Sequence, residues 1–404
     1  MIYSFGGQNF YSFRDEFVVD FRVKTQASER EIFQTDTLGQ KCNTVMAVFG
    51  ANASGKTHLL QALGFLQWFI LHSAQRKPDE GMTVGDMAFR FQASRNFVTD
   101  LFVEFEMEGQ HYRYDLSLNE QQVLKESMQV KKTRFTYLFE RVWNGATYDF
   151  KSQGFGENAY QIPQRQNASF ISTALLLENP VARKIDRFFS TGYGNLCALG
   201  RSESHDPHVD NLIDTAEFFE ENKDHLEWVN QRLANFDLGL HGIAMEKTKL
   251  LKHDGKEEER SIPFGVHRHD GKEYRLPLFH ESRGTQALFV LLRYILPVLK
   301  SGGLAYIDEF EAGLHSHMIP CLVDLFYTRK HNEKGAQLIF SCHADYVLTQ
   351  LEKYQIQIVD KNEEGVSSTY RLDEVKGVRN VDNHYAKYHS GAYGEFRIFE
   401  PVNT

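Results

Sequence analysis

The sequence predicts an α/β fold in which strand–loop–helix units are combined with antiparallel β elements and a helical insertion. A glycine-rich loop stands between an apolar strand and a helix at residues 45–63, and a second apolar strand, at 304–309, ends in two carboxylates. Strand-like alternation before residue 150 gives way to helical periodicity between residues 165 and 250. The chain has 404 residues, so we expect two or three domains, or one domain with a large insertion.

The first strands are expected in hairpins. Residues 1–24 alternate as a hairpin that leads toward the strand near residue 45. Later pairs of strand-like stretches predict antiparallel hairpins, one around 108–110 and one around the turn dipeptide Asn144-Gly145.

The glycine-rich loop runs from Gly50 to Thr57 and satisfies the pattern G-x-x-x-x-G-K-[ST]. In a loop of this kind, backbone N–H groups surround a β-phosphate, Lys56 reaches the β- and γ-phosphate oxygens, and the hydroxyl of Thr57 is placed for Mg²⁺. A glycine turn between two core elements is the alternative interpretation. The context predicts a P-loop NTPase fold that binds a nucleoside triphosphate through Gly50, Asn52, Ser54, Gly55, Lys56 and Thr57.

Helical runs follow, at 179–189 and 216–234, and they predict a compact helical lobe without a long heptad array. The charge run 252–260 predicts a solvated loop, and 262–276 predicts another hairpin. We therefore expect three parts, with boundaries at residues 1–160 for the N-terminal half of the nucleotide domain, 161–260 for the helical insertion, and 261–404 for the C-terminal half.

The strand from Leu304 ends in Asp308 and Glu309. Beside a phosphate loop, Asp308 would hold Mg²⁺ through water, and Glu309 would polarise the attacking water as a general base. An apolar run that ends in acid is common, so this signal gains weight from the phosphate loop rather than by itself.

Two further segments complete the predicted site. Ser282 and Gly284 precede a helical run and suit a phosphate contact, although Ser282 as a simple helix N-cap is the alternative. The strand at 336–343 ends in His343, which could sense a γ-phosphate or position water, or could be a polar strand-end residue without a catalytic role.

Composition restricts the classes of protein. The net charge of −9 disfavours electrostatic attraction between the molecule as a whole and nucleic acid, although binding through a local basic surface stays an alternative. Four scattered cysteines indicate neither a zinc knuckle nor a disulfide framework, which fits a reducing cytoplasm. We find no signal-peptide pattern and no apolar run long enough to cross a bilayer, so we expect a cytoplasmic protein without a membrane partner.

The order of these motifs resembles the ATPase domain of the ABC-type superfamily, in the branch with SMC, RecF and the overcoming-lysogenization-defect (OLD) proteins. Asn9–Phe13 resembles the N-F-x-S-F opening of that branch, Ser282–Gln286 its signature motif, Ala312–His315 its D-loop, and His343 its switch histidine. Glu281 stands where transporter-like members carry Leu. Stand-alone AAA-family ATPases of the RloA and AbiLi kind, often tied to phage defence, are similar, and the segment 388–394 resembles their C-terminal ending.

The resemblance implies a fold of ABC-ATPase type and an ATPase that uses ATP and Mg²⁺, with Lys56, Glu309 and His343 as catalytic residues. It implies that Thr57, Asp308 and Gln92 bind the metal. Gln92 is the candidate Q-loop residue, although the segment around it is also typical of a plain strand. It further implies a head-to-tail homodimer, or a higher oligomer, in which Ser282 and Gly284 cap the γ-phosphate bound to the other subunit.

Three functions stay open on the sequence. The first is an ATP-hydrolysing switch, in anti-phage defence, that controls a separate effector protein. The second is a RecF- or SMC-like DNA repair ATPase, for which Lys131, Lys132 and Arg134 are candidate contacts to nucleic acid, with a solvated strand face as the alternative. The third is a non-enzymatic scaffold stabilised by ATP, against which Glu309 argues because a structural site needs no general base.

Overall fold

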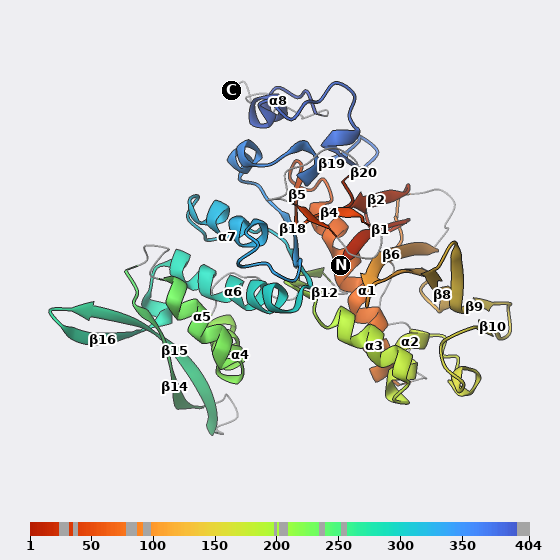
Figure 1. Cartoon of the computed structure of the whole chain (residues 1–404), viewed down its shortest axis with the longest axis horizontal. Helices are drawn as coiled ribbons and strands as arrows, with labels where there is room; N and C mark the ends of the chain where they lie inside the picture. The colour runs from red at the N-terminus through yellow and green to blue at the C-terminus, as the bar shows by residue number, and fades with distance from the viewer. Residues whose placement is uncertain are drawn as a thin grey trace.

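The computed structural model describes residues 1–23, 32–34, 39–77, 87–91, 98–197, 200–201, 209–233, 239–251 and 257–393. Two large sheets dominate this part of the chain, and a smaller sheet with two helices projects from it (Figure 1). Short elements complete it: β3 (Ile32–Gln34), β4 (Lys41–Asn43), β12 (Leu196–Cys197), β13 (Gly200–Arg201), and the 3-10 helices η1 (Ser73–Gln75), η2 (Ala159–Gln161), η4 (Leu278–His280), η5 (Asp345–Gln350), η6 (Lys353–Gln355) and η7 (Leu372–Glu374).

The first sheet is antiparallel throughout, in the order β10-β9-β8-β7-β6-β1-β2. The hairpins predicted at 1–24, around 108–110 and around Asn144-Gly145 are confirmed. Glu108 and Gly109 both have positive φ, 50° and 73°, as a two-residue hairpin turn of this twist requires. The strands are β1 (Ile2–Gln8), β2 (Phe17–Asp20), β6 (Thr99–Met107), β7 (Gln110–Leu118), β8 (Val123–Lys131), β9 (Phe135–Trp143) and β10 (Tyr148–Ser152).

The second sheet has the order β11-β17-β18-β5-β19-β20, and all its pairs are parallel except β19 with β20. Its central strands β5, β17 and β18 are buried along their whole length, which explains their continuous apolar sequences. The carboxyl ends of these three strands therefore meet at one edge. The strands are β5 (Val45–Phe49), β11 (Tyr193–Gly194), β17 (Leu304–Ile307), β18 (Gln337–Ser341), β19 (Ile356–Lys361) and β20 (Ser367–Arg371).

Helices cover both faces of the parallel sheet. Alternate residues of β5 divide between two cores: Met46 and Val48 join α1 (Lys56–His72) and the antiparallel sheet, while Val45 and Ala47 join the other helices. The first core also holds α2 (Phe170–Leu176) and α3 (Pro180–Phe189), and the second holds α6 (Arg283–Ser301), α7 (Met318–Tyr327) and α4 (Val209–Glu221). The layered α/β fold expected from the sequence is thus present.

The projecting part consists of β14 (Gly242–Leu251), β15 (Glu257–His269) and β16 (Lys272–Pro277), with α4 (Val209–Glu221) and α5 (Lys223–Leu233) beside them (Figure 1). The helical run predicted at 216–234 is confirmed over residues 216–233, where α4 and α5 are separated by Asn222, and residue 234 lies outside the described residues. The side-chain amide of Asn222 donates to the carbonyl of Phe218 at 2.8 Å. The predicted hairpin at 262–276 is confirmed.

The prediction of a loop at 252–260 was wrong for residues 257–260, which belong to β15. Arg260 faces α4 and bonds to Asp214 at 2.7 Å and to Glu217, so its charge is paired within the fold rather than solvated. The range 161–260 contains α2 to α5 together with β14 and the start of β15, and the domain boundaries drawn from the sequence remain predictions. None of the helices in the described residues is long and apolar enough to cross a membrane.

Candidate functional site

The glycine-rich loop leaves the end of β5 and enters α1, as the sequence predicted. A Cβ atom at Gly50 would lie 2.1 Å from the carbonyl oxygen of Val359, and one at Gly55 would lie 2.7 Å from the hydroxyls of Ser12 and Ser367. Gly55 also has φ of 116°. Neighbouring backbone and hydroxyl groups thus surround the loop so closely that only glycine fits at both positions.

Lys56 folds back over this loop. Its ammonium donates to the carbonyl oxygens of Gly50 at 2.8 Å and Ala51 at 3.0 Å. Burial lowers the pKa of Lys56, while the carboxylates of Asp308 and Glu311 act in the opposite direction. A phosphate group would replace two neutral carbonyl partners of this cation by charged oxygens, so the loop fits an anionic ligand.

Asp308 follows β17 and meets the loop across the sheet edge. The hydroxyl of Thr57 donates to Asp308 Oδ2 at 3.0 Å, although the two residues are 251 positions apart. Asn195 bonds to both backbone groups of Asp308, accepting from its N–H at 2.8 Å and donating to its carbonyl at 2.9 Å. The structure therefore brings the two predicted metal-binding oxygens together, and Asn195 fixes the backbone that carries one of them.

Ser341 links the carboxylate of Asp308 to the backbone of Glu309. Its hydroxyl donates to Asp308 Oδ1 at 2.6 Å and accepts from the N–H of Glu309 at 2.8 Å. Glu309 has φ of 50°, a left-handed conformation that costs a non-glycine residue free energy. The hydroxyl of Ser341 thus holds Glu309 in a strained turn at the end of the strand, where its carboxylate could accept a proton from a water beside the phosphate loop.

A third carboxylate, Glu311, was not predicted. Its Oε1 accepts from the backbone N–H of His343 at 2.7 Å, and its second oxygen is buried. Burial, followed by the charge of Glu311, raises the pKa of Cys342 well above its usual range, so the thiol stays protonated. The side chain of His343 is exposed at the same sheet edge, with its backbone fixed by Glu311.

Ser282 and Gly284 form a separate group at the start of α6. Ser282 caps this helix by accepting from the N–H of Thr285 at 3.2 Å, so its N-cap interpretation is confirmed. A Cβ at Gly284 would lie 3.6 Å from the carbonyl oxygen of Gly313 in the predicted D-loop. Glu281, just before the cap, bonds to His267 of β15 at 2.6 Å.

The donor set at the phosphate loop fits Mg²⁺. Thr57 and Asp308 offer one hydroxyl and one carboxylate, and Mg²⁺ takes few protein ligands when substrate phosphates and water supply the others. Among the residues that the structure describes, no cluster of three His, Cys, Asp or Glu side chains could hold a metal by itself. Gln92, the third predicted metal ligand, lies outside the described residues.

The family described as "AAA domain, putative AbiEii toxin, Type IV TA system" matches residues 45–349, which contain the phosphate loop, Ser282, Asp308 and Glu309. The chain belongs to this AAA family. A solved structure, "SMC head domain from Thermotoga maritima", is 16% identical, covers 92% of this chain and 98% of its own, and has a TM-score of 0.42. A search among curated proteins gave no match.

The N-terminal motif Asn9–Phe13 of this AAA-family chain packs against the start of α1, next to the phosphate loop. Ser12 bonds to His58 Nδ1 at 2.9 Å, and the ring of Tyr11 stacks on His58 with centroids 4.9 Å apart. Burial and then the charge of Lys361 lower the pKa of His58 to about 4, so this histidine is neutral at pH 7. The N–H of Ser367 donates to the carbonyl of Ser12 at 2.7 Å, which ties β20 to the same support.

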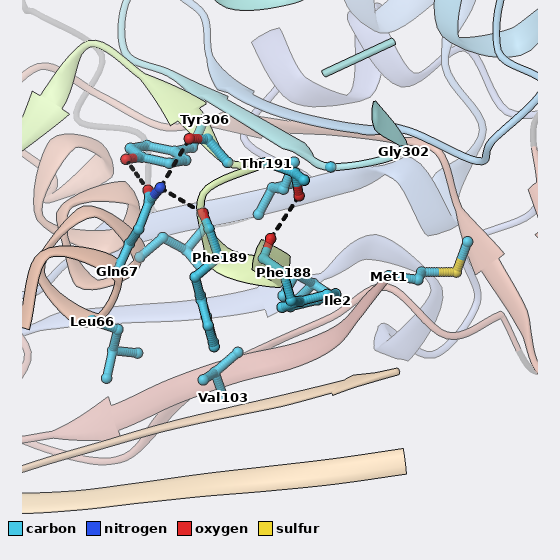
Figure 2. Close-up of a pocket in the computed structure, with 14 residues that line it drawn as sticks. Met1, Ile2, Leu66, Gln67, Val103, Phe188, Phe189, Thr191, Gly302 and Tyr306 are labelled. Carbon is cyan, nitrogen blue, oxygen red and sulfur yellow. Dashed lines mark hydrogen bonds between the residues drawn. The ribbon is translucent and has the colours of Figure 1, made fainter. Parts of the chain in front are cut away.

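A pocket lies at the start of β17, and Figure 2 shows residues that line it. It is lined by Leu66, Val103, Phe189 and Tyr306, and its polar contacts include the bond from the Tyr306 hydroxyl to Gln67 at 2.6 Å. Because ligands of α/β sheets bind at the carboxyl ends of the strands, this mostly apolar pocket is not the nucleotide site of the AAA domain.

Sequence analysis missed three residues of this site, and the sequence carries a signal for one of them. Ser341 follows an apolar strand and stands two residues before His343, so its place at the strand end could have been recognised. Asn195 and Glu311 carry no such signal, because Asn195 reaches Asp308 from 113 positions away and Glu311 acts on a backbone group.

Proposed function

We propose that the protein is a Mg²⁺-dependent ATPase that works as a molecular switch. The observation that carries this proposal is the contact of Thr57 with Asp308, which joins the phosphate loop to the acidic strand end. The AAA family of the chain supports a nucleoside triphosphate as the ligand. We assign ATP as the substrate and Mg²⁺ as the cofactor.

In the proposed reaction a water attacks the γ-phosphorus, and the bond from this phosphorus to the β,γ-bridging oxygen breaks, so that ADP and phosphate leave. Glu309 accepts the proton of the attacking water, and Lys56 offsets charge on the β- and γ-phosphate oxygens. Thr57 and Asp308 would hold Mg²⁺, which supplies neutralisation of phosphate charge. His343, exposed at the same edge, would position the water or sense the γ-phosphate.

We further propose that two copies associate head to tail, so that Ser282 and Gly284 of one copy cap the γ-phosphate bound to the other. Two observations support this arrangement. Ser282 is exposed, and it lies at the N-terminus of α6, where the helix dipole favours a phosphate group. Hydrolysis would then separate the copies, and the switch would act on a separate effector protein.

A role in anti-phage defence is the biological context that we propose. The family description names a toxin of a type IV toxin–antitoxin system, which supports a two-component system of this general class. The motif order, which resembles that of phage-defence ATPases, supports the same context.

The test measures ATP binding and hydrolysis by the wild type, Lys56→Ala and Glu309→Gln, with Lys330→Ala and Glu333→Gln as controls on exposed side chains. We expect Lys56→Ala to lose binding, and Glu309→Gln to bind ATP but hydrolyse it about 100-fold or more slower, the usual contribution of a general base. Light scattering of Glu309→Gln with Mg–ATP should give the mass of a dimer or larger assembly.

Other outcomes point elsewhere. If the wild type binds ATP without turnover, the scaffold function is correct instead. If Glu309→Gln hydrolyses ATP like its control, Glu309 is not the base.

A DNA-binding ATPase is the second candidate, because Lys131, Lys132 and Arg134 are all exposed where β8 turns into β9. Lys131 lies 5.7 Å above the ring of Phe135, which leaves its charge at the surface. If these residues contact phosphates, replacing all three by Ala should reduce the slope of log affinity against log salt by about 0.9 per lost contact. An unchanged slope would rule this surface out.

A further inference from the structure

Helix α8 (His384–His389) lies beyond β19 and β20 in the upper part of Figure 1, and the functional assignments above leave it unexplained. It is firmly packed. The ring of Tyr388, only 5% exposed, meets the ring of Phe49 edge to face at 6.1 Å, and Asn383 caps the helix by accepting from the N–H of Ala386 at 3.0 Å. Phe49 is the last residue of β5, so α8 covers the strand from which the phosphate loop departs.

The hydroxyl of Tyr388 reaches the loop itself. It lies in hydrogen-bonding contact with the backbone of Gly50, the first loop residue. Gly50 is the residue whose carbonyl accepts from Lys56, and the carbonyl of Val359 blocks any side chain on it. Gly50 is therefore held from two sides, by β19 and by Tyr388.

The next residue of the helix reaches the other half of the site. His389 Nε2 lies 3.2 Å from Asp345 Oδ2. Asp345 begins η5, two residues after His343, and α8 packs against η5. Burial raises the pKa of Asp345, while electrostatic interactions with His389, His343 and Lys56 act against this rise, so Asp345 stands within electrostatic reach of two predicted catalytic residues.

We propose that Tyr388 and His389 are positioning residues of the nucleotide site. Tyr388 fixes the start of the phosphate loop, and His389, through Asp345, fixes the segment that carries His343. These two neighbouring residues of α8 thus set the distance between the phosphate loop, which follows β5, and the segment with His343, which follows β18. Both must contact the same phosphate. This inference rests on the proposed ATPase function.

A purely structural role for α8 makes a different prediction. The side chains of His389 and Asp345 are 49% and 28% exposed, and an ion pair with that much solvent contributes little to folding. The same helix offers a matched control in Lys387, which pairs with Asp382 at 2.6 Å and is 39% exposed. If α8 only stabilises the fold, replacing Lys387 and replacing His389 should have similar effects.

The experiment determines kcat, KM for ATP and the urea midpoint for the wild type, His389→Ala, His389→Gln, Tyr388→Phe and Lys387→Ala. We expect His389→Ala to lower kcat about 10- to 100-fold, the cost of displacing a reacting group by a fraction of an ångström to one ångström, with a urea midpoint equal to that of Lys387→Ala. His389→Gln should recover most of the rate, because its amide can donate to Asp345. Tyr388→Phe keeps the ring on Phe49 and should mainly raise KM.

The contradicting results are equally specific. If kcat of His389→Ala equals that of Lys387→Ala, or if His389→Gln is no better than His389→Ala, His389 does not position the site. If Tyr388→Phe leaves KM unchanged, Tyr388 does not position the loop. Failure of the proposed function looks different, since the wild type itself would then not hydrolyse ATP, and the proposal for Tyr388 and His389 would fail with it.

Discussion

Replacing Ser341 by Ala tests whether the strand end is organised as described. The substitution removes the hydroxyl that donates to Asp308 Oδ1 at 2.6 Å and accepts from the N–H of Glu309 at 2.8 Å. A hydrogen bond to a charged group contributes about 1.5–3 kcal/mol, and a buried N–H left without an acceptor costs about 1–3 kcal/mol. Because Glu309 is half-buried, water can satisfy part of the second loss.

We therefore expect the free energy of unfolding to fall by about 2–3 kcal/mol in Ser341→Ala. If the transition state of hydrolysis is destabilised by the same free energy, kcat falls about 30- to 150-fold, because about 1.4 kcal/mol corresponds to a factor of ten in rate. Ser368→Ala, an exposed serine on β20, is the control. The assays are urea unfolding without nucleotide and steady-state hydrolysis of Mg–ATP.

A double-mutant cycle shows whether Ser341 acts through Asp308. Residues in contact couple by about 0.5–3 kcal/mol, so Ser341→Ala should cost less in an Asp308→Asn background than in the wild type. Ser341 does not organise the strand end if Ser341→Ala unfolds and hydrolyses ATP like Ser368→Ala, or if the effects of Ser341→Ala and Asp308→Asn add without coupling.

Two further predictions concern the antiparallel sheet. Burial disfavours the charge of Glu104, but hydrogen bonds from His111 and Arg113 outweigh it and lower the pKa from 4.5 to about 2; stability from this carboxylate is therefore present above pH 4.5 and lost as the pH falls toward 2. Glu104→Gln should lower the free energy of unfolding by about 2–3 kcal/mol at pH 7, and the urea midpoint of this variant should depend less on pH between pH 4.5 and 2. A variant whose urea midpoint varies with pH as in the wild type would contradict this. The pair of Arg141 and Glu126 is fully buried, so Arg141→Ala should cost about 3–5 kcal/mol in urea unfolding by leaving an unpaired charge, and a cost under about 1 kcal/mol would show that the pair does not stabilise the sheet.

The parts of the fold that the sequence predicted are those with local causes. The loop from Gly50 to Thr57 needs glycine for reasons of backbone and close approach, and the hairpin turn at Glu108-Gly109 is set by two positive φ angles. Asp308 and Glu309 could be predicted because an apolar strand that ends in acid beside such a loop leaves few alternatives.

The parts that the sequence did not predict depend on distant partners. Arg260 lies in a strand rather than a loop because α4 supplies its carboxylates, and the side chain of Asn195 matters only where the fold brings it to Asp308. The C-terminal motif was recognised by resemblance, yet its contact with the phosphate loop through Tyr388 is a property of tertiary packing.

The proposed nucleotide site is shared between two chains, and complementation of two inactive variants tests this arrangement. Lys56→Ala disables the phosphate loop, and Ser282→Asp preserves the helix cap but directs a carboxylate at the γ-phosphate. Each variant alone should be inactive. In an equal mixture, half of the randomly formed dimers carry one intact composite site, so hydrolysis should return to about a quarter of the wild-type rate. A mixture as inactive as its components, or full activity of Ser282→Asp alone, would show that the site is not shared between two chains.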